Sequence, residues 1–371
     1  MLRSTDRILT THTGSLPRPA LLAEATDDTR DELVAKAVVE VVQQQVAAGI
    51  DVVGDGEVGK PSYVTYITER AEGFGGQAGG VGGPSEAAEF PDWAQAIRAE
   101  ASEAFGMPAC IGPISRKDGA SSEEDANNLN AAIKSAGAKA GFLTSASPGV
   151  VTMFLENQYY PSHAAYLDAL VPVMRTEYES IHASGLALQV DCPDLAGSRH
   201  GPYAKTPLDE WKRIIEGHIE ALNEATSNIP PQDMRLHLCW GNYEGPHVND
   251  VALREVLPIV FKARPTAISF ESANPRHAHE WQVFEELALP EDKVIVPGVI
   301  DSTTNYVEHP EVVAERILKF ASVVPREQVA AGTACGFATF AGHAPVFPTV
   351  AYAKLKSLAD GAAIASDRLW N

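Results

Sequence analysis

The sequence lacks the features that would place the protein in a membrane, outside the cell or on nucleic acid. No apolar run approaches the roughly 20 residues that a membrane-spanning helix needs, and residues 1–30 lack the basic, apolar and small-residue regions of a signal peptide. Lysine and arginine total 29 against 49 aspartate and glutamate residues, a formal net charge of −20 that repels phosphodiester backbones and anionic lipid. We therefore expect a cytoplasmic protein that has no nucleic-acid or membrane partner.

Cysteine is scarce as well. The chain has four, Cys110, Cys192, Cys239 and Cys335, and they lie far apart. In a chain of this length they are read better as free thiols than as a disulfide framework. Cys110 and Cys192 fall within or just after apolar runs, so we interpret both as buried structural residues.

Apolar, β-prone runs alternate with helical patterns along the chain, an order that is typical of a parallel sheet covered by helices. The nine candidate strands are residues 7–12, 51–56, 108–115, 141–146, 186–191, 234–239, 267–272, 293–299 and 328–335. We predict an α/β fold, a (β/α)8 TIM barrel that forms one domain over residues 1–371. The alternative is a doubly wound open sheet, which is disfavoured because no glycine-rich dinucleotide fingerprint follows the first strand.

The chain is longer than the roughly 250 residues that such a barrel needs, so the excess is expected in loops. Residues 72–93 are rich in glycine and are predicted to lack regular structure. We treat residues 59–115 as an excursion after the second strand, with the apolar run 108–115 outside the barrel.

Polar residues stand at the carboxyl ends of several predicted strands, which is where a barrel gathers its catalytic groups. His237 and Cys239 alternate on one strand and leave it on the same side. Glu271 and Cys335 end later strands. One imidazole, one carboxylate and two thiolates form a tetrahedral set that suits zinc, although the His-x-Cys pair alone is equally well explained as the end of a core strand.

Other histidines have ordinary explanations. His12 ends the first strand and is predicted either to line the pocket or to be a hydrogen-bonded core residue. We expect the alternating pair His277 and His279 to be solvated or hydrogen-bonded. Capping or surface exposure is the expectation for four histidines in loops or at helix starts: His200, His247, His309 and His343.

The ordered motifs resemble the cobalamin-independent methionine synthase family, specifically its catalytic carboxyl-terminal barrel and its shorter single-barrel members, which include epoxyalkane:coenzyme M transferases. The resemblance covers nearly the whole chain. It is carried by "THTGSLPRP" (11–19), "GDGEVG" (54–59), "LQVDCPDLA" (188–196), "HLC" (237–239), "FES" (270–272) and "ACG" (334–336). It implies a zinc ion held by His237, Cys239, Glu271 and Cys335.

The resemblance also implies a reaction, in which zinc binds a thiol substrate and delivers it as the nucleophilic thiolate. Glu57 and Asp191 match the acidic groups that hold the ammonium of homocysteine, and Ser15 stands near its carboxylate. Carboxylates attract an ammonium and repel a sulfonate, so homocysteine is favoured over coenzyme M. The predicted function is methyl transfer to homocysteine, with methionine as the product.

The methyl or alkyl donor is less well defined. "GPISRKD" (112–118) resembles a family segment whose serine and arginine contact folate, which makes Ser115 and Arg116 candidates. However, a family tryptophan has no counterpart in residues 147–160, and "STTN" (302–305) replaces a histidine that is linked to proton delivery. Folate, a methylated corrinoid protein, a simple methylated small molecule and an epoxide all remain candidate donors.

Two other functions stay open. An epoxyalkane:coenzyme M transferase would need a cationic sulfonate pocket, built from residues such as Arg18, Arg116 or Arg199. A noncatalytic binding protein would enclose a structural zinc ion that cannot exchange a ligand for an added thiol. The sequence leaves room for a homo-oligomer and does not define the oligomeric state.

Overall fold

A parallel barrel forms the centre of the protein in the computed structural model, which describes residues 3–79, 84–101, 107–117, 122–342 and 344–371. Seven strands pair in the order β1-β4-β5-β6-β7-β8-β9, and every pairing in this sheet is parallel. The strands of the sheet are β1 (Val52–Gly54), β4 (Ala140–Ala146), β5 (Ala187–Cys192), β6 (Met234–Leu238), β7 (Ala267–Glu271), β8 (Val294–Ile300) and β9 (Gly332–Thr333).

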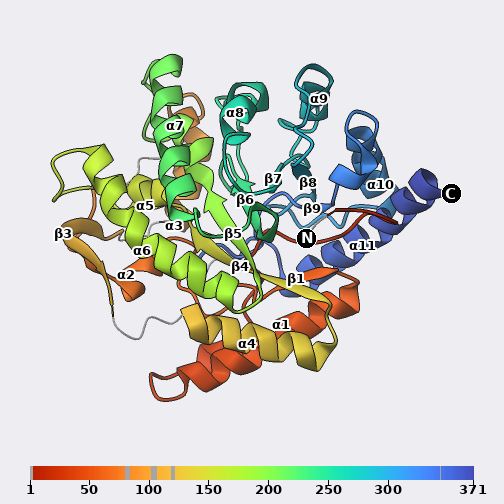
Figure 1. Cartoon of the computed structure of the whole chain (residues 1–371), viewed down its shortest axis with the longest axis horizontal. Coiled ribbons are helices and arrows are strands. Elements are labelled where there is room, and N and C mark those ends of the chain that lie inside the picture. Colours follow the sequence, from red (N-terminus) through yellow and green to blue (C-terminus); the bar gives the residue numbers. More distant parts are fainter. Residues whose placement is uncertain (1–2, 80–83, 102–106, 118–121, 343) are drawn as a thin grey trace.

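Helices surround these strands, with α7 to α10 along one end of the view and α1 and α4 at the opposite side (Figure 1). The α-helices are α1 (Arg30–Ala48), α2 (Ile67–Arg70), α3 (Pro91–Ala101), α4 (Ser122–Ala136), α5 (Pro148–Phe154), α6 (His163–Ala183), α7 (Leu208–Ala225), α8 (Leu253–Val260), α9 (Val283–Glu286), α10 (Pro310–Ala321) and α11 (Pro348–Trp370). Within the described residues, no helix is both long and apolar enough to cross a bilayer.

The ring of strands is closed by the segment that was expected to be the first strand. Residues 7–12 do not form a regular strand; only Thr10 and Thr11 make bridges, to Ala331 and Val52 respectively. The prediction of a full strand here was therefore wrong, because the pairing is limited to one residue on each side. These two bridges still join β1 to the end of the sheet that carries β9, as a (β/α)8 barrel requires.

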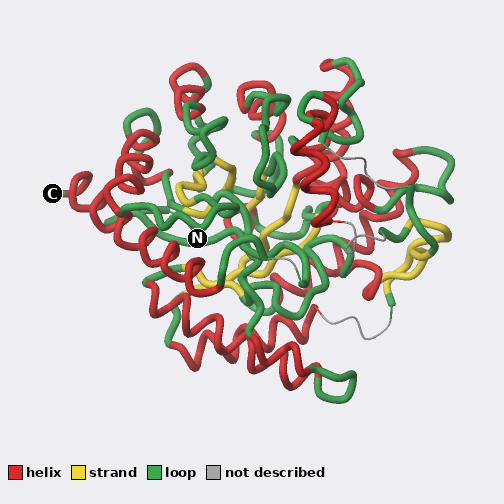
Figure 2. Tube along the Cα trace, turned by 180° about the vertical axis from the view of Figure 1, so that it is seen from behind, coloured by secondary structure: helices red, strands yellow, loops and turns green. Residues whose placement is uncertain are grey.

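The excursion after β1 lies outside the barrel, as predicted. Residues 108–115 contain most of β3 (Ala109–Arg116), which pairs antiparallel with β2 (Ala71–Gly75) in a separate two-stranded sheet. Figure 2 shows this two-stranded sheet at the edge of the molecule, away from the central strands. The prediction that residues 72–93 lack regular structure was wrong, since they hold most of β2, a 3-10 helix, η2 (Ser85–Ala88), and the start of α3.

The helices bury the faces that their apolar spacing predicts. In α6 the apolar residues that recur at three- and four-residue spacing are all buried: Leu167, Leu170, Val171, Met174, Tyr178 and Ile181. The Ser162 side chain caps the helix by accepting a hydrogen bond from Ala165 N at 3.1 Å. His309 caps α10 through Glu311 N, as its position before Pro310 suggested. Packing of these faces against the strands fixes the outer layer of the barrel.

Alternate residues of each strand point into the barrel and form layers. Gln189 on β5 is paired in register with Arg235 on β6, and the Arg235 side chain donates to Gln189 Oε1 at 2.6 Å. Two residues further along the same strands, Asp191 is paired with His237. The layer at the carboxyl ends of the strands therefore contains the residues predicted to form the site.

Candidate metal centre and active-site cavity

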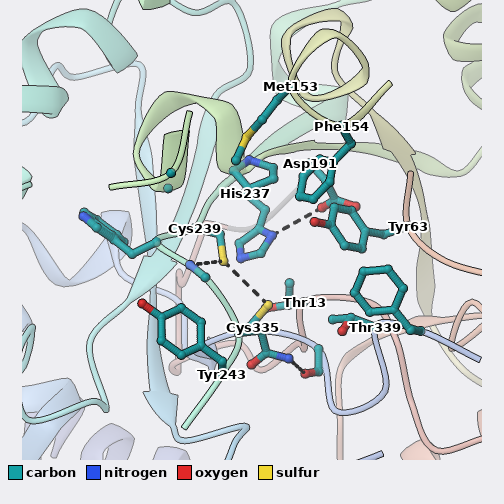
Figure 3. A pocket seen from close by; sticks show the side chains of 18 of the residues that line it. Thr13, Tyr63, Met153, Phe154, Asp191, His237, Cys239, Tyr243, Cys335 and Thr339 are labelled. Atoms are coloured by element: carbon teal, nitrogen blue, oxygen red, sulfur yellow. Dashed lines mark hydrogen bonds and ion pairs between the residues drawn. The ribbon is translucent and has the colours of Figure 1, made fainter. Parts of the chain in front are cut away.

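Three of the four predicted metal ligands meet at the carboxyl end of the barrel. One ligand atom each of His237, Cys239 and Cys335 lies within 4.8 Å of the other two, and all three residues are buried. Cys239 directly follows β6 and Cys335 lies two residues beyond β9. Their Sγ atoms are 3.9 Å apart, and both point toward the His237 ring (Figure 3).

The imidazole of His237 presents one nitrogen to this group. Its Nδ1 lies 3.4 Å from Asp191 Oδ1, whereas Nε2 is buried and has no hydrogen-bond partner in the described part of the chain. A buried ring nitrogen without a partner is costly unless a ligand binds it. Asp191 thus orients the ring so that Nε2 is available as a metal ligand, the usual role of a carboxylate behind a metal-binding histidine.

The two thiols share a hydrogen bond, and this lowers the pKa of Cys239. The same bond, together with burial, raises the pKa of Cys335 well above its usual range. The backbone N–H of Gly241 also donates to Cys239 Sγ at 3.3 Å, which stabilises negative charge on that sulfur. Two buried sulfurs and one unpaired imidazole nitrogen match the donor atoms that zinc prefers.

Glu271 ends β7 next to this group without being part of it. The carboxyl group hydrogen-bonds Asn274, and burial raises its pKa. No oxygen of Glu271 lies close enough to join His237, Cys239 and Cys335 within 4.8 Å. Its role as the fourth ligand therefore stays a prediction, and it would require the carboxyl group to leave Asn274.

A cavity of about 240 Å³ opens beside the candidate ligands. Aromatic and sulfur-containing side chains form much of its wall: Tyr63, Met153, Phe154, Trp240, Tyr243 and Phe340. The wall also includes Thr13, Ser15, Glu57, Asp191 and His200. Among the described lining residues there is no lysine or arginine. Figure 3 shows Tyr243 on one side of the two thiols and Tyr63, Asp191 and Thr339 on the other.

Glu57 reaches the cavity from an unusual turn after β1. Its φ angle is 55°, in the left-handed region that costs a non-glycine residue on the order of 1 kcal/mol. The turn is stabilised by a hydrogen bond from Glu57 N to Asp55 Oδ1 at 3.0 Å. A Cβ atom on Gly14 would stand 2.3 Å from Glu57 Oε1, so only glycine lets the first segment pass this carboxyl group.

The carboxyl group of Glu57 is poised to accept a cation. Burial raises its pKa to about 7, and the nearby Asp191 and Asp55 charges add to that shift while Lys60 opposes it. Its Oε2 is buried without a hydrogen-bond partner among the described residues. Lys60 Nζ bonds Thr144 instead, through the backbone oxygen at 2.6 Å and the hydroxyl group at 3.0 Å.

Ser15 joins the same part of the wall. Its hydroxyl oxygen accepts a hydrogen bond from Ala338 N at 3.3 Å, and its carbonyl accepts one from Phe337 N at 2.8 Å. A Cβ atom on Gly336 would stand 2.0 Å from Ser15 Oγ, so the glycine after Cys335 allows this contact. The segments around Ser15 and Cys335, at opposite ends of the chain, are thus held together.

Three predicted site residues do not reach the cavity wall. His12 is buried beneath it, with Nε2 2.8 Å from Gln45 Oε1 and its ring edge against Phe142. Ser115 is exposed on β3, and Arg116 on the same strand donates to Ser122 Oγ at 3.2 Å. Because Ser115 and Arg116 are not part of the cavity wall, the structure gives no support for their predicted contact with an alkyl donor.

The arginines named for a sulfonate pocket are also directed elsewhere. Arg18 donates to the backbone oxygens of Ala338 and Lys60, and Arg199 donates to those of Tyr203 and Ala204. Neither residue is part of the cavity wall. The cationic lining that would favour a sulfonate thiol is therefore missing among the described wall residues.

Sequence reasoning missed several wall residues and misjudged two histidines. The expectation of capping or surface exposure was wrong for His200 and His247, which are both buried, because each imidazole packs against the buried carboxylate of Asp250. His277 is buried and hydrogen-bonded, and hydrogen bonding is one of the two states predicted for it. His343 lies outside the described residues. Tyr63 and Phe340 carry no sequence signal beyond their positions in loops that follow strands.

Comparisons with known proteins agree with this geometry. Residues 10–354 match the family described as "Cobalamin-independent synthase, Catalytic domain". Methionine synthase from Saccharolobus solfataricus is 23% identical over 380 residues, which cover 97% of this chain and 95% of that protein. The 2-hydroxypropyl-CoM lyase of Xanthobacter autotrophicus is 23% identical over 377 residues, covering 94% and 87% respectively.

Solved structures show the same fold. A B12-independent methionine synthase from Shewanella sp. W3-18-1, in complex with selenomethionine, superposes with a TM-score of 0.76 at 21% identity, covering 98% of this chain and 99% of that one. A putative vitamin-B12 independent methionine synthase from Listeria monocytogenes gives a TM-score of 0.69 at 18% identity, covering 100% and 99%. From the barrel and the match over residues 10–354, we conclude that this chain belongs to the cobalamin-independent methionine synthase family, in its catalytic domain.

Proposed function

We propose that this protein is a zinc-dependent thiol S-alkyltransferase that transfers a methyl group to homocysteine. The observation that carries the proposal is the convergence of His237, Cys239 and Cys335 on one buried point in the wall of an apolar cavity. A metal at that point contacts the same cavity that Glu57 and Asp191 line.

The residues present fit a zinc ion. His237 Nε2 is buried without a partner in the described chain, and the two thiols lie close to it, so one nitrogen and two sulfur donors converge on one point. Glu271 is the proposed fourth ligand, because a carboxylate oxygen is displaced more easily than a thiolate. When bound, zinc lowers the pKa of a coordinated thiol and so supplies the nucleophilic thiolate at neutral pH.

The chain's own residues define the thiol substrate. Glu57 Oε2 is unpartnered and Asp191 stands beside it, so this side of the cavity attracts a cation such as the homocysteine ammonium group. Ser15 supplies a hydroxyl group nearby. The aromatic wall excludes water around the reacting sulfur, which favours attack on carbon over proton exchange with solvent.

One alternative enzyme has a specific observation in its favour. The similarity to 2-hydroxypropyl-CoM lyase supports an epoxyalkane:coenzyme M transferase with the same metal chemistry. The absence of lysine and arginine from the described cavity wall argues against it, since a sulfonate would face two carboxyl groups. The alternative that is not an enzyme is a binding protein with a purely structural zinc site. The open cavity beside the candidate ligands argues against that alternative.

The test combines metal content with a thiol screen. Purified protein is analysed for metals and then assayed for loss of free thiol, with homocysteine or coenzyme M and a reactive methyl donor. We expect about one zinc per chain and faster alkylation of homocysteine, by an order of magnitude or more. Zinc that is retained without exchange for added thiol would indicate a structural site. Preference for coenzyme M would favour the alternative enzyme.

A further inference from the structure

A buried carboxylate orients a second histidine at the cavity wall, apart from the metal centre. His200 follows the short 3-10 helix η4 (Gly197–Arg199), and Asp250 lies in the loop between β6 and α8. His200 Nδ1 is 3.0 Å from Asp250 Oδ1. Both atoms are buried and neither makes a well-aligned hydrogen bond in the described chain, so the 3.0 Å approach is a close electrostatic contact between them.

Asp250 is itself fixed by two further imidazoles. His247 places Nδ1 2.8 Å from Asp250 Oδ2 and Nε2 3.0 Å from the Tyr243 carbonyl oxygen. His277 places Nε2 2.9 Å from Asp250 Oδ2 and Nδ1 2.8 Å from Glu280 Oε2. Since every one of these partners is an acceptor, both rings must donate from both nitrogens and are cationic.

The pKa values of these two histidines support that reading. Burial lowers the pKa of His247, but its hydrogen bond to Asp250 outweighs burial and raises the value to about 9. The pKa of His277 rises to about 10 against the same cost of burial, through its bonds to Asp250 and Glu280. The two cations hold Asp250 ionised and in place, so its Oδ1 remains directed at His200.

With Nδ1 directed at Asp250, the His200 ring turns its other nitrogen toward the cavity. A Cβ atom on Gly241 would stand 3.7 Å from His200 Nε2, and Gly241 N donates to Cys239 Sγ. His200 and Gly241 both line the cavity. No hydrogen-bond partner of Nε2 is found among the described residues, and the atom is not one of the fully buried ones. His200 Nε2 therefore lies close to Gly241, whose N–H contacts the candidate metal ligand Cys239. It is free to contact a molecule bound in the cavity.

The ring of His200 neighbours Tyr243 in the cavity wall. Tyr243, whose ring centre is 6.3 Å from that of His200, stands across Cys239 and Cys335 from Asp191 (Figure 3). The same wall includes the apolar residues Pro84, Pro193, Pro202 and Trp240. A thiol held by Glu57 and Asp191 shares this cavity with His200, so an alkyl donor beside the thiol can contact His200 Nε2.

We infer that His200 is a catalytic acid that protonates the leaving atom of a small, uncharged alkyl donor, with Asp250 as its positioning residue. The inference rests on the proposed function. The thiol sulfur forms a bond to the donor carbon while the bond from that carbon to oxygen or nitrogen breaks. The leaving atom takes the bonding electron pair and the Nε2 proton of a His200 ring that is protonated on both nitrogens, and solvent then returns that proton to Nε2.

Two donors with different leaving atoms test this role. Epoxypropane opens to an alkoxide that needs a proton, whereas methyl iodide releases iodide, which does not; both are small and uncharged. With homocysteine as the thiol, His200→Gln should reduce turnover of epoxypropane by about 100-fold or more, the usual contribution of a general acid. Turnover of methyl iodide should stay within about threefold of the wild type, because its leaving group needs no acid.

His182→Gln is the matched control. His182 is also paired with an aspartate, with Nε2 3.1 Å from Asp233 Oδ2, but it lies at the end of α6 and does not line the cavity. It should leave the turnover of both donors unchanged. Zinc content and thermal melting of each variant show whether the metal site and the fold are retained.

A measurement on the wild type decides the matter even if the variant fails to fold. The epoxypropane rate should slow more in D2O than the methyl iodide rate does, because only the epoxide step transfers a proton to the leaving atom.

Each result bears on a different claim. Equal losses of both activities in zinc-loaded His200→Gln, or equal solvent isotope effects on the two wild-type rates, would overturn the inference alone. A wild-type enzyme that turns over epoxypropane no faster than His200→Gln would do the same. If the zinc-loaded wild type alkylates homocysteine with neither donor, the proposed function fails and the inference fails with it.

Discussion

Asp191 Oδ1 serves two partners at once, lying 3.4 Å from His237 Nδ1 and 2.7 Å from Gln189 Nε2. The arrangement ties the orientation of a candidate metal ligand to the residue predicted to hold the substrate ammonium. Gln189 in turn accepts a hydrogen bond from Arg235, so a chain of polar contacts runs up the barrel interior to the metal centre.

Replacing Asp191 by asparagine should therefore weaken metal binding without removing a ligand. The amide cannot support the same His237 tautomer and charge, and losing such a partner typically costs about 10- to 100-fold in metal affinity. Competition with a zinc chelator, followed by the fraction of metal retained, measures the change. Unchanged retention would mean that His237 is not oriented by this carboxylate.

Cys335→Ser should abolish zinc retention while the fold persists. The thiol is one of the three converging donors, and a serine hydroxyl is a poor ligand for zinc. Cys110→Ser is the control, because Cys110 is a buried thiol on β3 in the separate two-stranded sheet. Metal analysis and far-ultraviolet circular dichroism report the two properties. If Cys335→Ser keeps its zinc, the assigned centre is wrong.

Glu57→Gln should raise the KM for homocysteine about tenfold or more, since it removes a buried charge that faces the ammonium group. The effect should grow with pH, because a carboxyl group with a pKa of about 7 is mostly protonated at pH 6 and mostly ionised at pH 8. The KM for coenzyme M should fall or stay unchanged. Steady-state kinetics at pH 6 and pH 8 with both thiols make the comparison. Equal increases for both thiols would contradict the assigned ammonium subsite.

His12 provides a pH dependence of stability. Burial, followed by the Arg235 charge, lowers its pKa from 6.5 to about 3, so the unfolded chain binds a proton that the folded protein excludes. Stability contributed by this group is fully present above about pH 6.5 and is lost as pH falls, by about 1.4 kcal/mol per pH unit.

Urea unfolding between pH 4 and 6.5 measures that slope. His12→Gln should reduce it, whereas His279→Gln, at an exposed position, should not. An unchanged slope in His12→Gln would show that the folded protein accommodates the charged ring.

The alternation of apolar runs and helices was enough to predict the barrel and the excursion, because strand and helix periods are properties of local sequence. The convergence of three of the four predicted ligands could be predicted for a related reason. His237 and Cys239 occupy alternate positions at a strand end, and parallel strands bring Cys335 to the same edge.

Side chains from loops were harder to predict. His200 and Asp250 are 50 residues apart, on loops whose paths depend on long-range contacts such as the hydrogen bond from Ser85 N to the His200 carbonyl oxygen. No local periodicity encodes that contact. The same reason explains why the prediction for Ser115 and Arg116 was not supported. Their motif suggested a place in the site, but both residues belong to β3 in the separate two-stranded sheet, away from the cavity.

Closure of the ring by Thr10 and Thr11 joins the two ends of the barrel beside Cys335, so the candidate metal centre is complete only once that seam has formed. Cys335 is positioned against a segment that begins near residue 10, so a nascent chain that still lacks residues beyond about 330 holds His237 and Cys239 on an open sheet with no partner across the seam. Zinc supplied during synthesis would then act on the finished barrel and would not guide the earlier steps of its assembly.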